Sequence, residues 1–484
     1  MSAPFRLLAL LLLLGTTSVQ AQQPRNVVLI LSDDHRYDFM GFHERAPSWL
    51  ETPTMDRLAA EGAHLANAFV STALCSPSRA SILTGQYAHT HGVIDNTRLV
   101  PEGTVFFPQD LQEAGYETAF IGKWHMGETS DAPRPGFDYW ASFPGQGGYF
   151  NQRLNINGEH QERAGYITDD LTDLALEWLA TQESNDAPFF LYLSHKAVHH
   201  PFQPAPRHAG SYAEAPIPYP PTYWRTEGNL RDLPRWAQEQ RYSWHGVDYP
   251  FYFEIGDFEA IYRSFAETVR GIDDSIGRVI AYLEEAGLSD NTLVLYLGDN
   301  GFSLGEHGLL DKRHAYEESM RIPMLAWAPS FIAPGTTITE MAMNVDIAAT
   351  VLDLAGVTVP ERMAGRSLLP LLRGEAVPDW RDDILYEYYW EYHFPQNPTT
   401  YALRTDRFKY IFYHGVWDRN IELFDLQADP FERSNLALVP AHRAQVREMH
   451  NRLFARLVEA GAEDVAFQQP ALWQLDRRLR PGQD

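Results

Sequence analysis

The segment Asn26-Val27-Val28-Leu29-Ile30-Leu31-Ser32-Asp33-Asp34 joins a short apolar run to two adjacent carboxylates. An apolar run of this length, rich in branched side chains, is typical of a strand that is buried on both faces of a parallel sheet. Ligands of such sheets bind at the carboxyl ends of the strands, which is where the two carboxylates stand. The segment therefore predicts a buried parallel strand with a polar site at its end.

The same pattern recurs further along the chain. Four more apolar runs are predicted strands, at 64–70, 117–121, 189–193 and 292–297. Helical periodicity lies between the strands, at 54–61, 168–181 and 259–286. Strands that alternate with helices indicate an α/β fold. We expect a large, mainly parallel sheet that is covered by helices on both faces.

The chain changes character after Arg373-Gly374. Strands of a small antiparallel sheet are predicted at 384–392, 401–404, 408–413 and 422–425, followed by an amphipathic helix at 441–460. We therefore predict an N-terminal domain over 22–377 and a smaller C-terminal subdomain over 378–484. Residues 201–250 are rich in Pro, Tyr, Trp and Arg, and we expect an ordered excursion near the site rather than a linker.

The first residues resemble a targeting segment. Arg6 precedes the apolar residues 7–14, and Val19-Gln20-Ala21 offers small residues for cleavage. We predict a signal peptide over 1–21 and a protein that is exported, to the periplasm or the medium. The apolar run is too short for a membrane anchor, so we expect no transmembrane anchor after cleavage.

The formal net charge of −25 bears on partners. A nucleic acid needs a basic surface, so we expect no nucleic-acid partner. An anionic substrate would instead require a local positive pocket on an acidic body.

Polar clusters follow the predicted strands, and two of them are rich in oxygen. Asp33-Asp34 and Asp299-Asn300 are hard ligands that suit calcium or magnesium rather than zinc. Either pair alone could merely cap a helix. Two such pairs at the ends of parallel strands favour a metal site.

Cys75 is the only cysteine of the chain. A lone cysteine in an exported protein suggests chemistry, although a free cysteine is more often a small buried hydrophobe. Cys75 stands just before a predicted helix at 80–87, whose N-terminus favours an anion. A basic set completes the pattern and could stabilise an oxyanion and protonate a leaving group: Arg79, Lys123, His125, His199 and Lys312.

These motifs resemble a known family. Cys75-Ser76-Pro77-Ser78-Arg79, with Leu83-Thr84-Gly85 behind it, is similar to the signature of the type I, formylglycine-dependent sulfatases of the alkaline phosphatase superfamily. Gly122-Lys123-Trp124-His125 is similar to the second signature of that family, and Gly298-Asp299-Asn300-Gly301 to one of its metal-ligand pairs. The resemblance runs from Asn26 to about Leu436 and places the catalytic domain at 22–377.

The resemblance implies hydrolysis of sulfate esters. It implies that a separate enzyme, either formylglycine-generating or anaerobic sulfatase-maturing, oxidises Cys75 to Cα-formylglycine, whose hydrated form attacks sulfur. It implies a calcium ion, in preference to magnesium, bound by Asp33, Asp34, Asp299, Asn300 and residue 75. Arg79 and Lys123 would stabilise charge, Lys312 and His199 would face the leaving oxygen, and His125 would assist release of sulfate. His199 is preferred over His195 and His200 because it stands two residues before a proline.

The expected substrate is a sulfated polysaccharide or an oligosaccharide derived from one, because export and aromatic segments suit a carbohydrate. The same aromatics could equally pack the interface between the two domains. Candidates for binding substrate beyond the sulfate are His35, Arg36, Arg98, His314 and Arg404.

Two alternatives stay open. One is a phosphonate monoester or phosphodiester hydrolase of the same superfamily. The other is a non-catalytic binder of sulfated glycans, in the case that Cys75 is never matured.

Overall fold

A ten-stranded sheet forms the centre of the protein, in the order β11-β2-β10-β9-β1-β8-β4-β5-β6-β7. The computed structural model describes residues 25–248, 257–417 and 419–462. Four neighbouring central strands are mutually parallel: β9 (Thr292–Gly298), β1 (Asn26–Ser32), β8 (Phe189–Ser194) and β4 (Glu117–Lys123). In register, Leu31 lies opposite Ser194, and Ser32 opposite Gly298. These strands therefore end together at one edge of the sheet, as the sequence predicts.

The outer strands make the sheet mixed. On one side, β10 (Met324–Trp327) pairs antiparallel with β9, and β2 (Ala63–Leu65) and β11 (Thr336–Ile338) follow it. On the other side, β5 (Tyr139–Phe143) is parallel to β4, while β6 (Arg153–Ile156) and β7 (Glu159–Glu162) are antiparallel. The parallel prediction is thus confirmed at the centre of the sheet, which is the part that builds the site.

One predicted strand is wrong. Residues 64–70 form two short strands rather than one: β2 ends at Leu65, and β3 (Ala68–Phe69) pairs with β12 (Ala342–Met343) in a separate two-stranded sheet. A turn at Ala66-Asn67 separates them, and the Asn67 amide Nδ2 donates to Thr339 O over 2.7 Å. Asn67, with its own side-chain hydrogen bond, interrupts the strand at this point. The apolar content of residues 64–70 does not reveal such an interruption.

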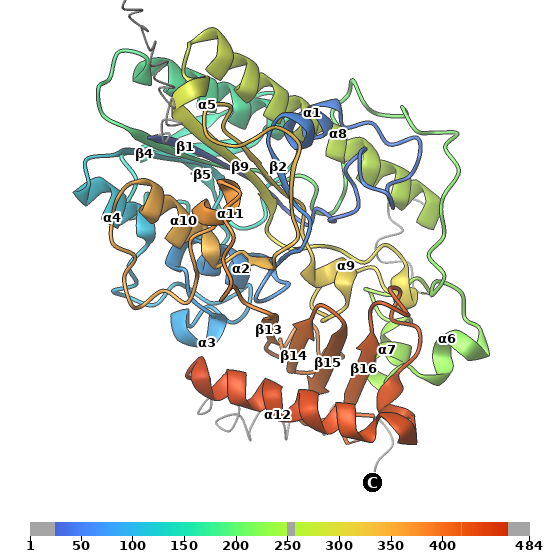
Figure 1. Cartoon of the computed structure of the whole chain (residues 1–484). Coiled ribbons are helices and arrows are strands. Elements are labelled where there is room, and N and C mark those ends of the chain that lie inside the picture. The colour runs from blue at the N-terminus through green and yellow to red at the C-terminus, as the bar shows by residue number, and fades with distance from the viewer. Residues whose placement is uncertain (1–24, 249–256, 418, 463–484) are drawn as a thin grey trace, which may run out of the picture.

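Alternate residues of β1 face two cores. Val28 and Ile30 pack among residues of α1 (Pro53–Glu61), α5 (Ile167–Gln182) and α8 (Phe258–Glu285). Val27, Leu29 and Leu31 pack on the opposite face among residues of α2 (Cys75–Thr84), α4 (Phe107–Glu113) and α10 (Asp346–Leu354). Figure 1 shows the two helical layers on either side of the sheet. This is the side-chain alternation that a strand buried on both faces requires.

The C-terminal part is an antiparallel sheet with one long helix. Its strands are β13 (Asp383–Tyr388), β14 (Thr400–Thr405), β15 (Phe408–Tyr413) and β16 (Ile421–Asp425). Helix α12 (Arg443–Glu459) lies along this sheet and buries Met449, Leu453 and Leu457. Side chains of this sheet share one apolar core with α2 and α10, so the small sheet is docked tightly on the large one. The boundary at 378 stays a prediction.

The aromatic excursion is ordered where it is described. It carries the short helices α6 (Glu227–Arg231) and α7 (Arg235–Gln240), and residues 249–250 lie outside the described part. Its last stretch runs beside the segment before Lys312, because Val247 N donates to Gly308 O and Leu310 N to His245 O. Three short helices complete the fold: α3 (Ala88–His91), α9 (Glu317–Met320) and α11 (Leu369–Leu372).

Within the described part, no helix combines the length and the apolar composition that crossing a membrane would need. The predicted signal peptide at 1–21 lies outside the described residues.

Candidate active site

The carboxyl ends of the four central strands bring the predicted polar residues together. Asp33 and Asp34 follow β1, Lys123 ends β4, and Asp299 and Asn300 follow β9. All five side chains are buried, with at most 1% of each residue exposed. Residues that lie up to 267 positions apart in the sequence therefore share one site because their strands are adjacent and parallel.

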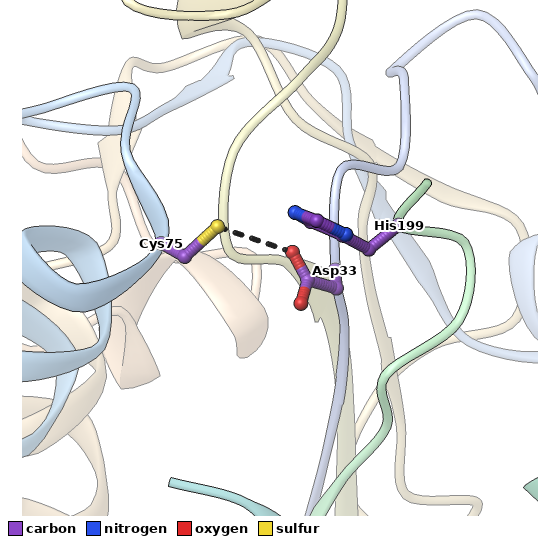
Figure 2. A group of neighbouring side chains, drawn as sticks. All are labelled: Asp33, Cys75 and His199. Atoms are coloured by element: carbon purple, nitrogen blue, oxygen red, sulfur yellow. Dashed lines mark hydrogen bonds between the residues drawn. The ribbon is translucent and has the colours of Figure 1, made fainter. Parts of the chain in front are cut away.

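Cys75 reaches this site on a helix. It is the first residue of α2, five residues before the start predicted from the sequence, and the helix ends at Gly85, whose φ of 67° only glycine adopts readily. The Cys75 Sγ donates to Asp33 Oδ1 over 3.4 Å. Figure 2 shows Cys75, Asp33 and His199 converging from three different elements. Burial, and then the Asp33 carboxylate, raise the pKa of the Cys75 thiol, so the unmodified side chain is a thiol and a weak nucleophile.

Arg79, one helical turn after Cys75, ties the helix to the strand ends. Its Nε donates to Asp299 Oδ2 over 2.9 Å, and its Nη1 donates to Lys123 O over 2.7 Å and to Ser194 Oγ over 2.6 Å. Lys123 donates to Asp33 and, over 2.5 Å, to Gln146 Oε1. Both cations are thus held rigidly, which is what a preorganised anion site needs.

Three carboxylates crowd together in the site. Oxygens of Asp33, Asp34 and Asp299 all lie within 4.8 Å of one another. Burial, followed by repulsion from Asp33, raises the pKa of Asp299 to about 7. Burial opposes ionisation of Asp33 as well, but the cations Lys123, Arg79 and Lys312 outweigh it and hold the pKa of Asp33 well below its usual value. Crowding of buried carboxylates is unfavourable unless a cation lies beside them.

Asn300 supplies the test for a metal. Its Nδ2 donates to Asp34 Oδ1 over 2.7 Å, whereas its Oδ1 is buried without a hydrogen-bond partner. An unpaired amide oxygen beside three carboxylates is the donor set of a hard divalent cation such as calcium. The residues present therefore fit the metal that the resemblance implies.

Lys312 and His199 lie on the Asp34 side of the cluster. The Lys312 Nζ donates to both Asp34 oxygens, over 2.5 and 2.6 Å, and its pKa is raised well above the usual value although burial opposes this, because Asp34 is so close. The His199 Nδ1 lies 2.8 Å from His200 O, which leaves Nε2 toward Asp34 Oδ2, 3.8 Å away. Burial and then Lys312 lower the pKa of His199 well below its usual value, so the ring is neutral at rest.

The fold separates His195 from His199. The His195 Nε2 lies 3.0 Å from Ser275 Oγ on helix α8, away from the cluster, whereas atoms of His199, Asp33 and Cys75 lie within 4.8 Å of one another. The preference for His199 thus has geometric support.

His125 lies beside the start of α2. Its Nδ1 is 3.3 Å from Ser76 Oγ, and its Nε2 is 3.4 Å from Glu128 Oε1. Burial and then Lys123 lower the pKa of His125 to about 3, so this ring is neutral at rest.

Four of the five predicted substrate contacts have structural partners instead. The His35 ring bonds to Tyr296 and Phe39, and Arg36 pairs with Asp38 and Glu306. Arg404 pairs with Glu317, and His314 stacks on Trp236. All four residues are buried. Arg98 is exposed, with its Nε 3.4 Å from Asp95.

Sequence reasoning missed residues that orient the predicted ones. Gln146 accepts from Lys123, Ser194 accepts from Arg79, and Tyr149 OH donates to His199 O over 2.5 Å. The loop Gly145-Gln146-Gly147-Gly148 could have signalled a close approach of the backbone to a site. For Ser194, the sequence offers no indication of a role in the site other than its place at the end of a strand.

Comparison with known proteins agrees with this geometry. The family model described as Sulfatase matches residues 25–357, and the model described as N-sulphoglucosamine sulphohydrolase, C-terminal, matches residues 305–459. An N-acetylglucosamine-6-O-sulfatase of Bacteroides thetaiotaomicron is 33% identical over 98% of this chain and 93% of its own length. The N-acetylglucosamine-6-sulfatase of Homo sapiens is 32% identical over 81% of this chain and 72% of its own length.

A solved structure is similar to this chain over most of its fold as well. It contains a protein in complex with its substrate D-glucosamine-2-N,6-O-disulfate, and it superimposes with a TM-score of 0.83 at 31% identity, covering 93% of this chain and 100% of that one. The buried nucleophile position, the fixed cations and these matches lead to one conclusion: the chain belongs to the sulfatase family of the alkaline phosphatase superfamily, and it is a sulfuric ester hydrolase.

Proposed function

We propose that this sulfatase removes 6-O-sulfate from glucosamine residues of a sulfated polysaccharide, or of an oligosaccharide derived from one. The carrying observation is the position of Cys75, at a helix N-terminus and 3.4 Å from Asp33. The carboxylates of this cluster also hold the cations Arg79, Lys123 and Lys312. The choice of sugar is supported by the relatives, which are named for N-acetylglucosamine 6-sulfate.

The nucleophile is proposed to be a modified Cys75. Its raised thiol pKa argues against a thiolate. Oxidation to Cα-formylglycine by a separate maturing enzyme would supply a hydrated aldehyde as the nucleophile toward sulfur. Asp33 accepts a hydrogen bond from the side chain at position 75 and so orients it. His125, whose Nδ1 lies 3.3 Å from Ser76 Oγ beside the start of α2, is assigned the proton that must be taken up when sulfate is released.

The sulfate charge is proposed to bind between fixed cations. Arg79 is held by Asp299 and Ser194, and Lys123 by Asp33 and Gln146, so both present donors without rearrangement. A calcium ion held by Asp33, Asp34, Asp299 and Asn300 would add a fixed positive charge toward a sulfate oxygen.

The leaving oxygen is assigned to Lys312 and His199. Lys312 stays protonated at neutral pH, and it lies beside the inward-facing Nε2 of His199. Together they place a charged donor and a proton-transfer group on the same side of the site, where the sugar alcohol must depart. Tyr149 holds the backbone of His199 in place.

Export is part of the proposal. The segment 1–21 has the order of a signal peptide, which supports action in the periplasm or the medium, where polymeric glycans are met.

The test is substrate release by protein matured in a host that forms formylglycine. A panel of 2-O-, N- and 6-O-sulfated glucosamine saccharides is incubated with the enzyme, and the positions that lose sulfate are read by NMR. Loss at O6 of glucosamine is expected. Phosphonate monoesters and phosphodiesters are assayed beside aryl sulfate, and a higher kcat/KM on either of them would replace sulfate as the natural ester.

A further inference from the structure

An aromatic cavity of about 540 Å³ opens between two segments that are far apart in the sequence. Residues 242–245 of the excursion form one wall, and residues 392–396 of the loop between β13 and β14 form the other. Three of the lining rings are unusually exposed: Tyr392 to 77%, Trp244 to 54% and Tyr242 to 48%. Large aromatic side chains gathered in a concave surface mark a binding site rather than a solvated face.

The cavity is joined to the active site through three consecutive residues, Asp311-Lys312-Arg313. Lys312, the middle residue, reaches into the carboxylate cluster. Asp311 lies 2.9 Å from the His245 Nδ1 in one wall, and the Arg313 guanidinium lies 3.6 Å from the centre of the Phe394 ring in the other.

The two walls also meet each other. The His245 and Phe394 rings contact edge to face at 4.7 Å. Both cavity walls therefore pack against the backbone segment that carries Lys312, a residue assigned to the leaving oxygen.

His200 relates the cavity to the leaving-group side of the active site. Besides burial, Lys196, Lys312 and His245 all lower the pKa of His200, so this histidine lies within electrostatic reach of both the cavity wall and Lys312. His200 follows His199, the second group assigned to the leaving oxygen. The cavity is consequently placed with Lys312 and His199, the two residues assigned to the departing alcohol, through the contacts of Asp311 and Arg313.

The chemistry of the lining suits an anionic saccharide. None of the nine lining side chains that the structure describes is acidic, although the whole chain carries a formal charge of −25. Asp311 behind the wall is compensated by Arg313. A pyranose ring presents a face of C–H groups that can cover an aromatic ring, while the serine, histidine and glutamine side chains of the lining offer hydrogen bonds to hydroxyls.

We propose that this cavity binds the saccharide portion of the substrate on the leaving-group side, with pyranose rings stacked on Trp244 and Tyr392. The assignment rests on the proposed function, because it names the part of a sulfated glycan that lies beyond the ester. It makes these two aromatic residues determinants of glycan affinity, distinct from the residues that hold the sulfate.

The test compares Trp244→Ala and Tyr392→Ala with Trp224→Ala. Trp224 is a matched control, because it is 55% exposed, belongs to the same excursion and lies outside the cavity lining. Binding of a tetrasaccharide that contains 6-O-sulfated glucosamine is measured by calorimetry in a Cys75→Ala background, where no turnover occurs. The kcat/KM of the matured single variants is measured on the same tetrasaccharide and on 4-nitrophenyl sulfate.

Each cavity variant should raise the Kd and lower kcat/KM on the tetrasaccharide at least about tenfold, and the loss should be larger than on 4-nitrophenyl sulfate. Trp224→Ala should match the parent. Unchanged Kd and kcat/KM in both cavity variants would overturn the assignment while leaving the sulfatase function intact. If the parent enzyme cleaves 4-nitrophenyl sulfate but no saccharide, the proposed function fails instead, and the calorimetric comparison still decides the cavity.

Discussion

Two buried charge clusters of this protein differ in what their charges do. At the sheet edge, Arg79 pairs with Asp299, whose pKa is raised to about 7 by burial and by the neighbouring Asp33. At the junction with the C-terminal sheet, Arg404 and Lys409 converge on Glu317. Burial opposes ionisation of Glu317 too, but these cations outweigh it and its pKa falls far below the usual value.

The difference teaches how to recognise a site among buried ions. Around Glu317, the cations Arg404 and Lys409 lie close to the carboxylate, and Lys409 also pairs with Glu432, so ion pairs of this cluster hold two sheets together. At the sheet edge, three carboxylates crowd around one another and an amide oxygen has no partner. Among the described residues, crowding of oxygen ligands within 4.8 Å is found at the sheet edge and not around Glu317. Crowding of possible metal ligands, rather than burial, marks the functional cluster.

The largest expected effect is at Cys75. Cys75→Ala should lower sulfate release by at least about 10³-fold, because no group is left to form the covalent intermediate. Peptide mass spectrometry of the matured wild type should show the mass change from thiol to aldehyde at position 75. An Ala variant that keeps full activity would contradict the mechanism.

Replacing one arginine of each cluster by methionine tests the difference between the two clusters directly. Arg79→Met should lower kcat about 10²–10³-fold, because a fixed donor to the sulfate is lost. Arg404→Met should instead lower the free energy of unfolding by about 3 kcal/mol, because it removes a cation beside the buried Glu317 carboxylate. The KM should stay unchanged, because no group at the sheet edge is altered. Denaturant unfolding and steady-state kinetics of both variants separate these outcomes. A raised KM at normal stability in Arg404→Met would make Arg404 a substrate contact after all.

Removing divalent cations should affect only the sheet-edge cluster. A chelator is expected to lower the Tm, and calcium at 100 times its Kd should restore about 2.7 kcal/mol of stability. Calorimetric scans with and without calcium measure this, and Asn300→Ala should weaken the calcium dependence. Identical scans in chelator and in calcium would argue against a metal site.

The smallest effect concerns pH at the junction. Burial raises the pKa of Glu422 to about 8, although the hydroxyls of Tyr413 and Tyr316 donate to it. Its protonated form stabilises the fold, so this contribution is complete below about pH 4.5 and is lost as the pH rises through about 8. Glu422→Gln removes the dependence and should gain about 1 kcal/mol or more over wild type at pH 9, and little at pH 5. The measurement is Tm against pH for both proteins, and parallel curves would contradict the expectation.

Much of the fold and of the site follows from local pattern. The central strands, the long helices α5 and α8, and the positions of Asp33, Cys75, Lys123 and Asp299 were all predictable, because burial periodicity and motif spacing are short-range properties. The start of α2 at Cys75 was not predictable, because Pro77 and two serines give weak helix signals. Only packing between the strand ends and the core of α2, α4 and α10 fixes this first turn.

The direction of side chains does not follow from the sequence. His35 and Arg36 follow Asp33-Asp34 in the chain, yet they turn away and bond to Tyr296 and Glu306. Spacing cannot tell which of four consecutive polar residues faces a site, because the answer depends on partners more than 260 positions away.

The sequence by itself determined the class of chemistry: a lone cysteine in a specific motif, oxygen ligands at strand ends and a set of basic residues. Only the tertiary structure decided which histidine joins Asp33 and Cys75, that Asn300 Oδ1 has no partner, and that residues 242–245 and 392–396 enclose one cavity. The physical reason is that chemistry resides in residue types, which the sequence contains, whereas proximity comes from packing between segments that are distant in the chain.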